Sequence, residues 1–291
     1  MHDYLRAVGF SSYIRRKEMD VLIEYVKESP SERIITPIGS GCSFVQINRA
    51  FGNQFGLTVV GEYDDEDVFH LDHCFPYCKG NYVSTEETIN MKKISDKEAY
   101  ESYCDDLNIG CPLIFFLQNI SDYVRSCWSN VPNQYATDVR LGALSIEGTI
   151  LLGTKKNFKD YLERNLNKLE RNELILSARG GDQNAIDSLT LNDMDAYSVI
   201  AQRIEHEDIL TIVDTSFMPY GVECDQYSII GMIMSVHPCK NDYTGENLWL
   251  LSVVSNDIVV DICINDKDLL GEPMVGRRFK GVIWLQGHIL L

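Results

Sequence analysis

The last third of the chain is built from closely spaced runs of strand composition, and this pattern limits the possible folds more than any other feature. Tight links rich in Asp, Asn and Gly separate the runs and are typical of hairpin turns. The runs cover residues 209–215, 225–236, 248–254, 258–264 and 281–285. So many strands in about 80 residues can close into a small barrel or a strongly curled sheet, and an OB-like barrel is one candidate.

The first part of the chain combines a helix with further strands. Residues 14–28 predict an amphipathic helix, because Met19, Leu22, Ile23 and Val26 recur at helical spacing in an otherwise charged segment. Four runs of strand composition follow and predict an antiparallel meander. These runs are residues 33–37, 44–51, 56–63 and 68–75.

The middle of the chain becomes strongly helical. Before it, residues 96–107 predict a helix, and residues 138–152 predict a hairpin that turns at Glu147-Gly148. Residues 157–178 then predict one helix, and two shorter helices are expected after Asp182.

These elements predict an α+β protein in three parts. A chain of 291 residues is long for a single core. We expect an α+β domain with an N-terminal antiparallel sheet at residues 1–153, a helical connector at 154–208, and a β-rich domain at 209–291.

Charge and cysteine content narrow the class of protein. The formal net charge of −17 opposes binding to duplex nucleic acid, since the phosphate backbone would be repelled. The nine cysteines are an odd number without a C-x-x-C pair, which indicates reduced thiols in a cytoplasmic protein. No signal peptide is recognisable, and no apolar run approaches the roughly 20 residues of a membrane span. We therefore expect a cytoplasmic protein without membrane contact.

The chain also shows weak internal sequence similarity when it is aligned with itself at an offset of 161 residues. About nine identities align, among them Glu62 with Glu223 and Cys78 with Cys239, where roughly three are expected by chance. This internal similarity indicates either an internal duplication with a site between similar halves, or two meanders with similar turns.

The densest cationic run in the C-terminal half predicts a binding surface. Arg277, Arg278 and Lys280 stand near the ring of Trp284, an arrangement that can hold an anion, a nucleotide or single-stranded nucleic acid. The alternative is that these cations only neutralise neighbouring acids such as Asp266. We expect a non-enzymatic protein that binds a small anionic ligand or an unknown protein partner. The candidate binding residues are Tyr220, Glu223, Asp225, Arg277, Arg278, Lys280 and Trp284.

Two weaker patterns support an alternative, a hydrolase-like enzyme assisted by a metal. Glu223 and Asp225 are paired carboxylates that can perform acid–base chemistry when burial separates their pKa values. His70, Asp72 and Cys74 are metal-ligand types on one face of a predicted strand, but no distant partner motif accompanies them. The sequence therefore assigns no catalytic residue, metal or cofactor.

Three patches of sequence carry a family resemblance. They are Met1-His2-x-Tyr4-Leu5-Arg6-Ala7-x-Gly9-Phe10, Phe217-Met218-Pro219-Tyr220-Gly221, and Gly276-Arg277-Arg278-Phe279-Lys280-Gly281-x-Ile283-Trp284-Leu285-Gln286-Gly287. These patches resemble an uncharacterised family of clostridial gut bacteria (gut Firmicutes), known as a domain of unknown function. The resemblance implies a match over the whole chain and implies no activity.

Overall fold

The computed structural model describes most of the chain in two compact units. The described residues are 2–13, 15–39, 41–85, 87–94, 99–105, 112–128, 138–153, 170–204, 210 and 213–290. One unit combines Met1–Leu151 with Thr215–Leu291, and the other is Leu152–Asp214. In this part of the chain, every helix is too short or too polar to cross a membrane.

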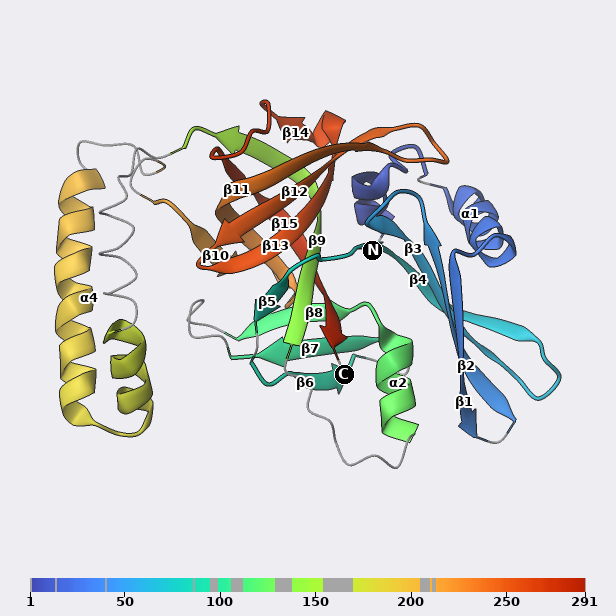
Figure 1. The fold of residues 1–291 in the computed structure, drawn as a ribbon, viewed down its shortest axis with the longest axis horizontal. Helices are drawn as coiled ribbons and strands as arrows, with labels where there is room; N and C mark the ends of the chain where they lie inside the picture. The colour runs from blue at the N-terminus through green and yellow to red at the C-terminus, as the bar shows by residue number, and fades with distance from the viewer. Residues whose placement is uncertain are drawn as a thin grey trace. The chain divides into compact units, whose positions relative to one another are not determined.

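The first unit opens with the predicted antiparallel meander, which is confirmed. Strands β1 (Glu32–Gly39), β2 (Cys42–Ala50), β3 (Phe55–Tyr63) and β4 (Phe69–Cys78) pair in sequence order as a four-stranded sheet (Figure 1). Helix α1 (Arg16–Glu28) packs against β2 and β3. Its predicted apolar stripe is buried, because Met19, Leu22, Ile23 and Val26 all face the core.

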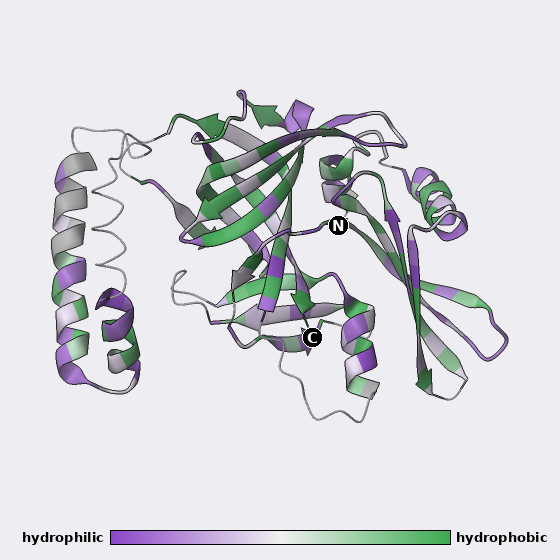
Figure 2. Ribbon diagram, viewed as in Figure 1, coloured by the Kyte–Doolittle hydropathy of each residue, from purple (hydrophilic) through white to green (hydrophobic). Residues whose placement is uncertain are grey.

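The strand-rich end of the chain forms a closed five-stranded barrel, which confirms the predicted α+β class with its C-terminal barrel. The barrel strands are β9 (Asp138–Leu151), β11 (Gln226–Lys240), β12 (Asn247–Ser255), β13 (Ile258–Asn265) and β15 (Arg278–Leu290). They are hydrogen-bonded in the order β11-β12-β13-β9-β15, and β15 closes the circle onto β11. Figure 2 shows that hydrophobic residues are concentrated on these strands.

The connectivity around this barrel is that of an OB fold with its last strand placed first. In an OB fold, three strands form a meander, the third pairs in parallel with the fifth, and the fourth closes onto the first. Here β11, β12 and β13 are the meander, β9 pairs in parallel with β13, and β15 joins β9 to β11. The OB-like candidate therefore describes the pairing, although β9 precedes the other four strands in the chain.

The remaining strands extend the same sheet. Strand β10 (Ser216–Pro219) pairs with β11, while β5 (Val83–Thr85) and β14 (Leu269–Leu270) pair with β9. Strands β6 (Asn90–Lys93), β7 (Tyr100–Cys104) and β8 (Leu113–Leu117) continue it, with β8 beside β15. Short helices lie at η1 (His2–Val8), α2 (Ile120–Trp128) and η2 (Asp266–Asp268).

The N-terminal residues cover the outside of the barrel. The ring of Tyr4 lies 5.3 Å from the ring of Trp284 on β15. Two backbone carbonyls of η1 accept hydrogen bonds from asparagine side chains. Asn265 Nδ2, on β13, donates to Arg6 O at 3.1 Å, and Asn241 Nδ2, just after β11, donates to Val8 O at 2.7 Å. The outer face of β13, where an OB fold commonly binds its ligand, is thus occupied by this chain's own N-terminus.

Two local predictions were wrong. Tyr100–Cys104 is strand β7 and not part of a helix, because pairing with β6 and β8 outweighs the local helical composition. Glu147-Gly148 is not a turn but the middle of the long strand β9. Gly148 is needed for packing there, since a Cβ at this position would lie 2.5 Å from Phe279 Cε2 inside the barrel.

The second unit is helical. Residues 170–179 form a helix, and α4 (Gln183–Ile204) is one continuous helix where two were expected. Asp182 precedes it, and Asp182 Oδ1 accepts from the amide of Asn184 at 2.9 Å. The first half of the predicted 157–178 helix lies outside the described residues.

The three-part domain division and the internal duplication stay predictions. The structure shows that β9, from the expected N-terminal domain, lies between β13 and β15 of the expected C-terminal domain.

Candidate functional site

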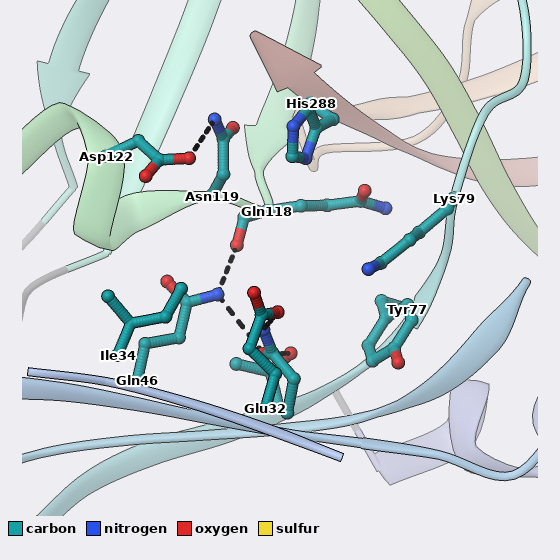
Figure 3. Close-up of a pocket in the computed structure, with 11 residues that line it drawn as sticks. Glu32, Ile34, Gln46, Tyr77, Lys79, Gln118, Asn119, Asp122 and His288 are labelled. Carbon is teal, nitrogen blue, oxygen red and sulfur yellow. Dashed lines mark hydrogen bonds between the residues drawn. The ribbon is translucent and has the colours of Figure 1, made fainter.

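The first unit encloses a polar cavity of about 100 Å³. It lies between the four-stranded sheet on one side and α2 with the end of β15 on the other (Figure 3). We call this site the polar cavity. Its lining residues are Glu32, Ile34, Gln46, Asn48, Thr58, Tyr77, Lys79, Gln118, Asn119, Asp122 and His288.

Asn48 on β2 organises the sheet side of the polar cavity. Its Oδ1 accepts from Gln46 Nε2 at 3.2 Å and from Thr58 Oγ1 at 2.9 Å, and its Nδ2 donates to Glu32 Oε2 at 3.0 Å. Gln46 and Asn48 share one face of β2 because side chains alternate along a strand. The network fixes the Glu32 carboxylate at the edge of the sheet.

Two glutamines form the opposite side. Gln118 Nε2 donates to Cys78 O at 2.7 Å and to Gln286 Oε1 at 2.9 Å. Gln286 Nε2 donates to Pro76 O at 2.8 Å, and Gln286 Oε1 also accepts from the Cys78 amide at 3.2 Å. Gln46 Nε2 reaches across to Gln118 O at 2.9 Å (Figure 3). The amides therefore connect β2, β4 and β15 around the cavity.

Gln118 Oε1 is a buried acceptor without a hydrogen-bond partner among the described residues. The side chain is 5% exposed and lines the polar cavity. Flipping the amide to satisfy this oxygen would break the two hydrogen bonds that its Nε2 makes. A buried polar atom left unpaired destabilises a protein by about 1–3 kcal/mol. The oxygen therefore marks a position for a donor supplied by solvent or by a ligand.

Opposite charges face the polar cavity without forming an ion pair. Lys79 Nζ lies 5.5 Å from the centre of the Tyr77 ring and points into the space between the labelled side chains (Figure 3). Within the described part of the chain, no ion pair of 4 Å or less joins Lys79 to Glu32 or to Asp122. Burial, with a smaller contribution from Glu32, raises the pKa of Tyr77, so its hydroxyl stays neutral.

His288 is held at the cavity as a neutral imidazole. Burial lowers its pKa; Asp122 opposes this shift, and the positive charge of Lys79 adds to it. Asn119 positions the neighbouring end of β15, because its Nδ2 donates to Ile289 O at 2.9 Å and its Oδ1 accepts from the Ile289 amide at 3.0 Å. The same Nδ2 donates to Asp122 Oδ2 at 3.0 Å, which fixes that carboxylate (Figure 3).

A second and more open hollow of about 370 Å³ lies on the barrel. We call it the barrel hollow. Two of the residues predicted for the binding surface, Tyr220 and Lys280, line it together. The other lining residues are Glu147, Gly148, Thr149, Ser228, Asp268, Gly281 and Val282.

The other aromatic and acidic residues of the predicted surface lie outside the lining of this hollow. Trp284 is 8% exposed and packs its ring against Tyr4 and Phe116. Its Nε1 donates to Asp225 Oδ2 at 2.7 Å, and burial raises the pKa of Asp225. Glu223 is exposed. Asp225 is thus engaged by an indole while Glu223 faces solvent, and the two carboxylates have different surroundings.

The three predicted cations have different surroundings. Arg277 donates from Nη1 to Glu272 O at 2.7 Å. Arg278 is buried, and burial lowers its pKa. Lys280 is exposed and is the one of the three that lines the barrel hollow. Asp268, one of the nearby acids, pairs instead with Arg6 from the N-terminus.

The histidines of β4 form separate pairs with acids. His70 Nε2 lies 2.6 Å from Asp64 Oδ2, and His73 Nδ1 lies 3.2 Å from Asp72 Oδ2. The described residues contain no group of three or more His, Cys, Asp or Glu side chains arranged to hold a metal ion.

Sequence reasoning missed the polar cavity entirely. Its residues extend from Glu32 to His288 and come together only when the sheet and the barrel pack. Strand β2 contains a sequence feature that could have indicated the cavity. There the polar residues Gln46 and Asn48 alternate with the apolar residues Val45 and Ile47, and all four are buried. Buried polar pairs of this kind need partners, which places a polar group opposite them.

Comparison with known proteins gives one match. A family model described as "Domain of unknown function, E. rectale Gene description (DUF3881)" matches residues 5–287. No curated protein and no solved structure matches the chain. The matched range includes most of the three resembling patches, every residue that lines the barrel hollow, and every residue that lines the polar cavity except His288.

Proposed function

The chain belongs to this family, whose description names no activity, and we propose that the protein binds a small polar molecule in the polar cavity. The observation that carries the proposal is the Gln118 amide. The side chain belongs to a lining residue of the cavity, its Nε2 is fixed by two acceptors, and its buried Oε1 has no donor among the described residues. A ligand that donates to this oxygen replaces a destabilising contact with a favourable one.

The arrangement of the surrounding groups supports binding over a purely structural role. Structural polar networks are stable when every member has a partner. Here the sheet side is satisfied through Asn48, whereas the buried Gln118 Oε1 and the exposed Lys79 Nζ have no hydrogen-bond partners among the described residues. Preorganised polar groups of this kind fix the orientation of small ligands.

Thermal unfolding of the full chain with a panel of small polar molecules tests this proposal. A ligand present at 100 times its Kd stabilises the folded state by about 2.7 kcal/mol, which corresponds to roughly 5 °C in Tm for a unit of this size. At least one of Glu32→Gln and Lys79→Gln, both at the cavity lining, should abolish the shift for the molecule that gives it. Lys92→Gln, at an exposed position on β6, is the matched control and should keep it. If no small amine, acid, amide or sugar raises Tm, the proposal is wrong.

The barrel hollow is the second candidate, and it takes up the binding surface expected from the sequence. We propose it as a site for a small anion or an acidic segment of a protein partner. Its support is that Lys280 and Tyr220 line one hollow of about 370 Å³, although Glu147 and Asp268 lower the local positive charge. Salt-sensitive binding of inorganic phosphate or a polyanion, lost in Lys280→Gln, would support it. Binding that Lys280→Gln leaves unchanged would place the anion elsewhere.

We also propose a reducing, cytoplasmic location. The described cysteines are free thiols, and several are fully buried. The test is to take the protein directly from cells, denature it without reductant and alkylate it. All nine cysteines should then be labelled. Protection of any pair would contradict this location.

A further inference from the structure

We infer that the ligand of the polar cavity is a small zwitterion, with an ammonium group facing Glu32 and Asp122 and an anionic group facing Lys79. This inference rests on the proposed function and names the class of molecule that the cavity selects. Its basis is that opposite charges face the same small cavity and do not pair with each other.

The two carboxylates at the cavity each accept a hydrogen bond from an asparagine, and they outnumber the positive charges. Glu32 is held by Asn48 at 3.0 Å, and Asp122 is held by Asn119 at 3.0 Å. Lys79 is the only lining residue with a permanent positive charge, since burial keeps His288 neutral. The cavity therefore offers two carboxylates and one ammonium, which favours a ligand that brings a cation.

A ligand with a single charge would leave part of this site unmatched. An amine would satisfy the carboxylates but would meet Lys79 as a like charge, while a carboxylate would satisfy Lys79 and be repelled by Glu32. Such mismatches weaken binding most at the half-buried Asp122, because water and salt screen the exposed Glu32 and Lys79 more strongly. A zwitterion meets each protein charge with its opposite and avoids both penalties.

The buried acceptor and the neutral imidazole agree with this orientation. An ammonium has three N–H donors, so it can serve Gln118 Oε1 as well as carboxylates. A neutral His288 can donate one hydrogen bond to an anionic group without adding charge. In Figure 3 the Lys79 ammonium and the Glu32 carboxylate point into the space between the sheet and β15.

The size of the cavity limits the ligand to a few heavy atoms. Its volume of about 100 Å³ holds more than one water, since one water needs roughly 10–15 Å³ by the same kind of measure. It is smaller than the roughly 300–1,000 Å³ typical of pockets for drug-sized molecules. A molecule of amino-acid size fits these limits.

Calorimetric titration of the full chain with matched probes tests the inference. The zwitterions are glycine, β-alanine and 4-aminobutyrate, which differ in charge separation, and the singly charged analogues are 1-propylamine and propionate. We expect one zwitterion to bind at least 10-fold more tightly than either analogue. Two conservative variants should then give a crossed pattern. Lys79→Gln should weaken the zwitterion at least 10-fold but should not weaken propylamine, because it removes a like charge that the amine meets, while Glu32→Gln should weaken both the zwitterion and propylamine.

The outcomes separate this inference from the proposed function. If propylamine binds as tightly as the best zwitterion and Lys79→Gln changes nothing, the site is a cation site; the inference is then wrong while the proposed function stands. If none of these probes and no other small polar molecule binds, both are wrong. Lys92→Gln should behave as wild type throughout, and urea unfolding confirms that each variant is folded.

Discussion

Replacing Gln286 with leucine should destabilise the first unit because this buried amide connects three parts of the chain. Gln286 is fully buried on β15. It donates to Pro76 O, accepts from the Cys78 amide and accepts from Gln118 Nε2. In Gln286→Leu the Pro76 carbonyl and the Cys78 amide lose this partner, while Gln118 Nε2 keeps its hydrogen bond to Cys78 O. Leucine has a similar volume but no polar atom.

The size of the effect follows from those two groups. Each buried polar group left unpaired costs about 1–3 kcal/mol, so the loss is roughly 2–6 kcal/mol. Burying the leucine side chain offsets about 1–2 kcal/mol of this. The free energy of unfolding should therefore fall by about 3 kcal/mol, which lowers the urea midpoint by roughly 1 M at the m-values usual for larger domains.

Urea unfolding followed by circular dichroism measures this difference directly. The matched control is Gln54→Leu, because Gln54 is half-buried and makes one long hydrogen bond, from its Nε2 to Lys79 O at 3.5 Å. The control should change the free energy of unfolding by less than about 1 kcal/mol. A Gln286→Leu protein that unfolds within about 0.5 kcal/mol of wild type would show that the glutamine network does not hold β4 and β15 together.

Two further predictions concern a glycine in the barrel and a histidine at the cavity. Gly148→Ala places a Cβ 2.5 Å from Phe279 Cε2 and should lower the free energy of unfolding by about 2 kcal/mol. The control is Gly276→Ala, at φ +84° with no atom within 4 Å, which should lower it by roughly 1 kcal/mol through backbone strain alone. Equal losses in urea unfolding would contradict the close packing at Gly148. Because burial lowers the pKa of His288 in the folded state, the unfolded state binds more protons below about pH 6.5. Wild-type stability should therefore fall more between pH 7.5 and pH 5 than the stability of His288→Gln, and parallel curves would refute this assignment.

The parts of the fold that were predictable from sequence are those with a local cause. The stripe of Met19, Leu22, Ile23 and Val26 predicts α1 because helical periodicity is read within a few residues. The link at Ser255-Asn256-Asp257 predicts a hairpin, and Asn256 and Asp257 adopt positive φ of 48° and 63° between β12 and β13. In both cases the information lies in neighbouring residues.

The parts that were not predictable depend on distant residues. Gly148 resembles a turn residue until Phe279, more than a hundred positions later, is placed beside it. The polar cavity has the same cause, since Gln46 and Gln118 meet only after the sheet packs against the barrel. Tyr220 and Lys280 line one hollow, and their role in binding stays a prediction. The burial of Arg278 depends on closure of the barrel, which the local sequence does not specify.

The late position of β15 has a consequence for biosynthesis. Strand β9 is complete at Leu151, yet its barrel neighbours β13 and β15 begin only at Ile258 and Arg278. While the ribosome makes the intervening segment, the nascent β9 carries apolar side chains with no barrel to receive them. Pairings between strands so far apart form slowly and leave strand edges open to aggregation. Chaperone dependence and a low yield of refolding at high protein concentration follow from this order of strands.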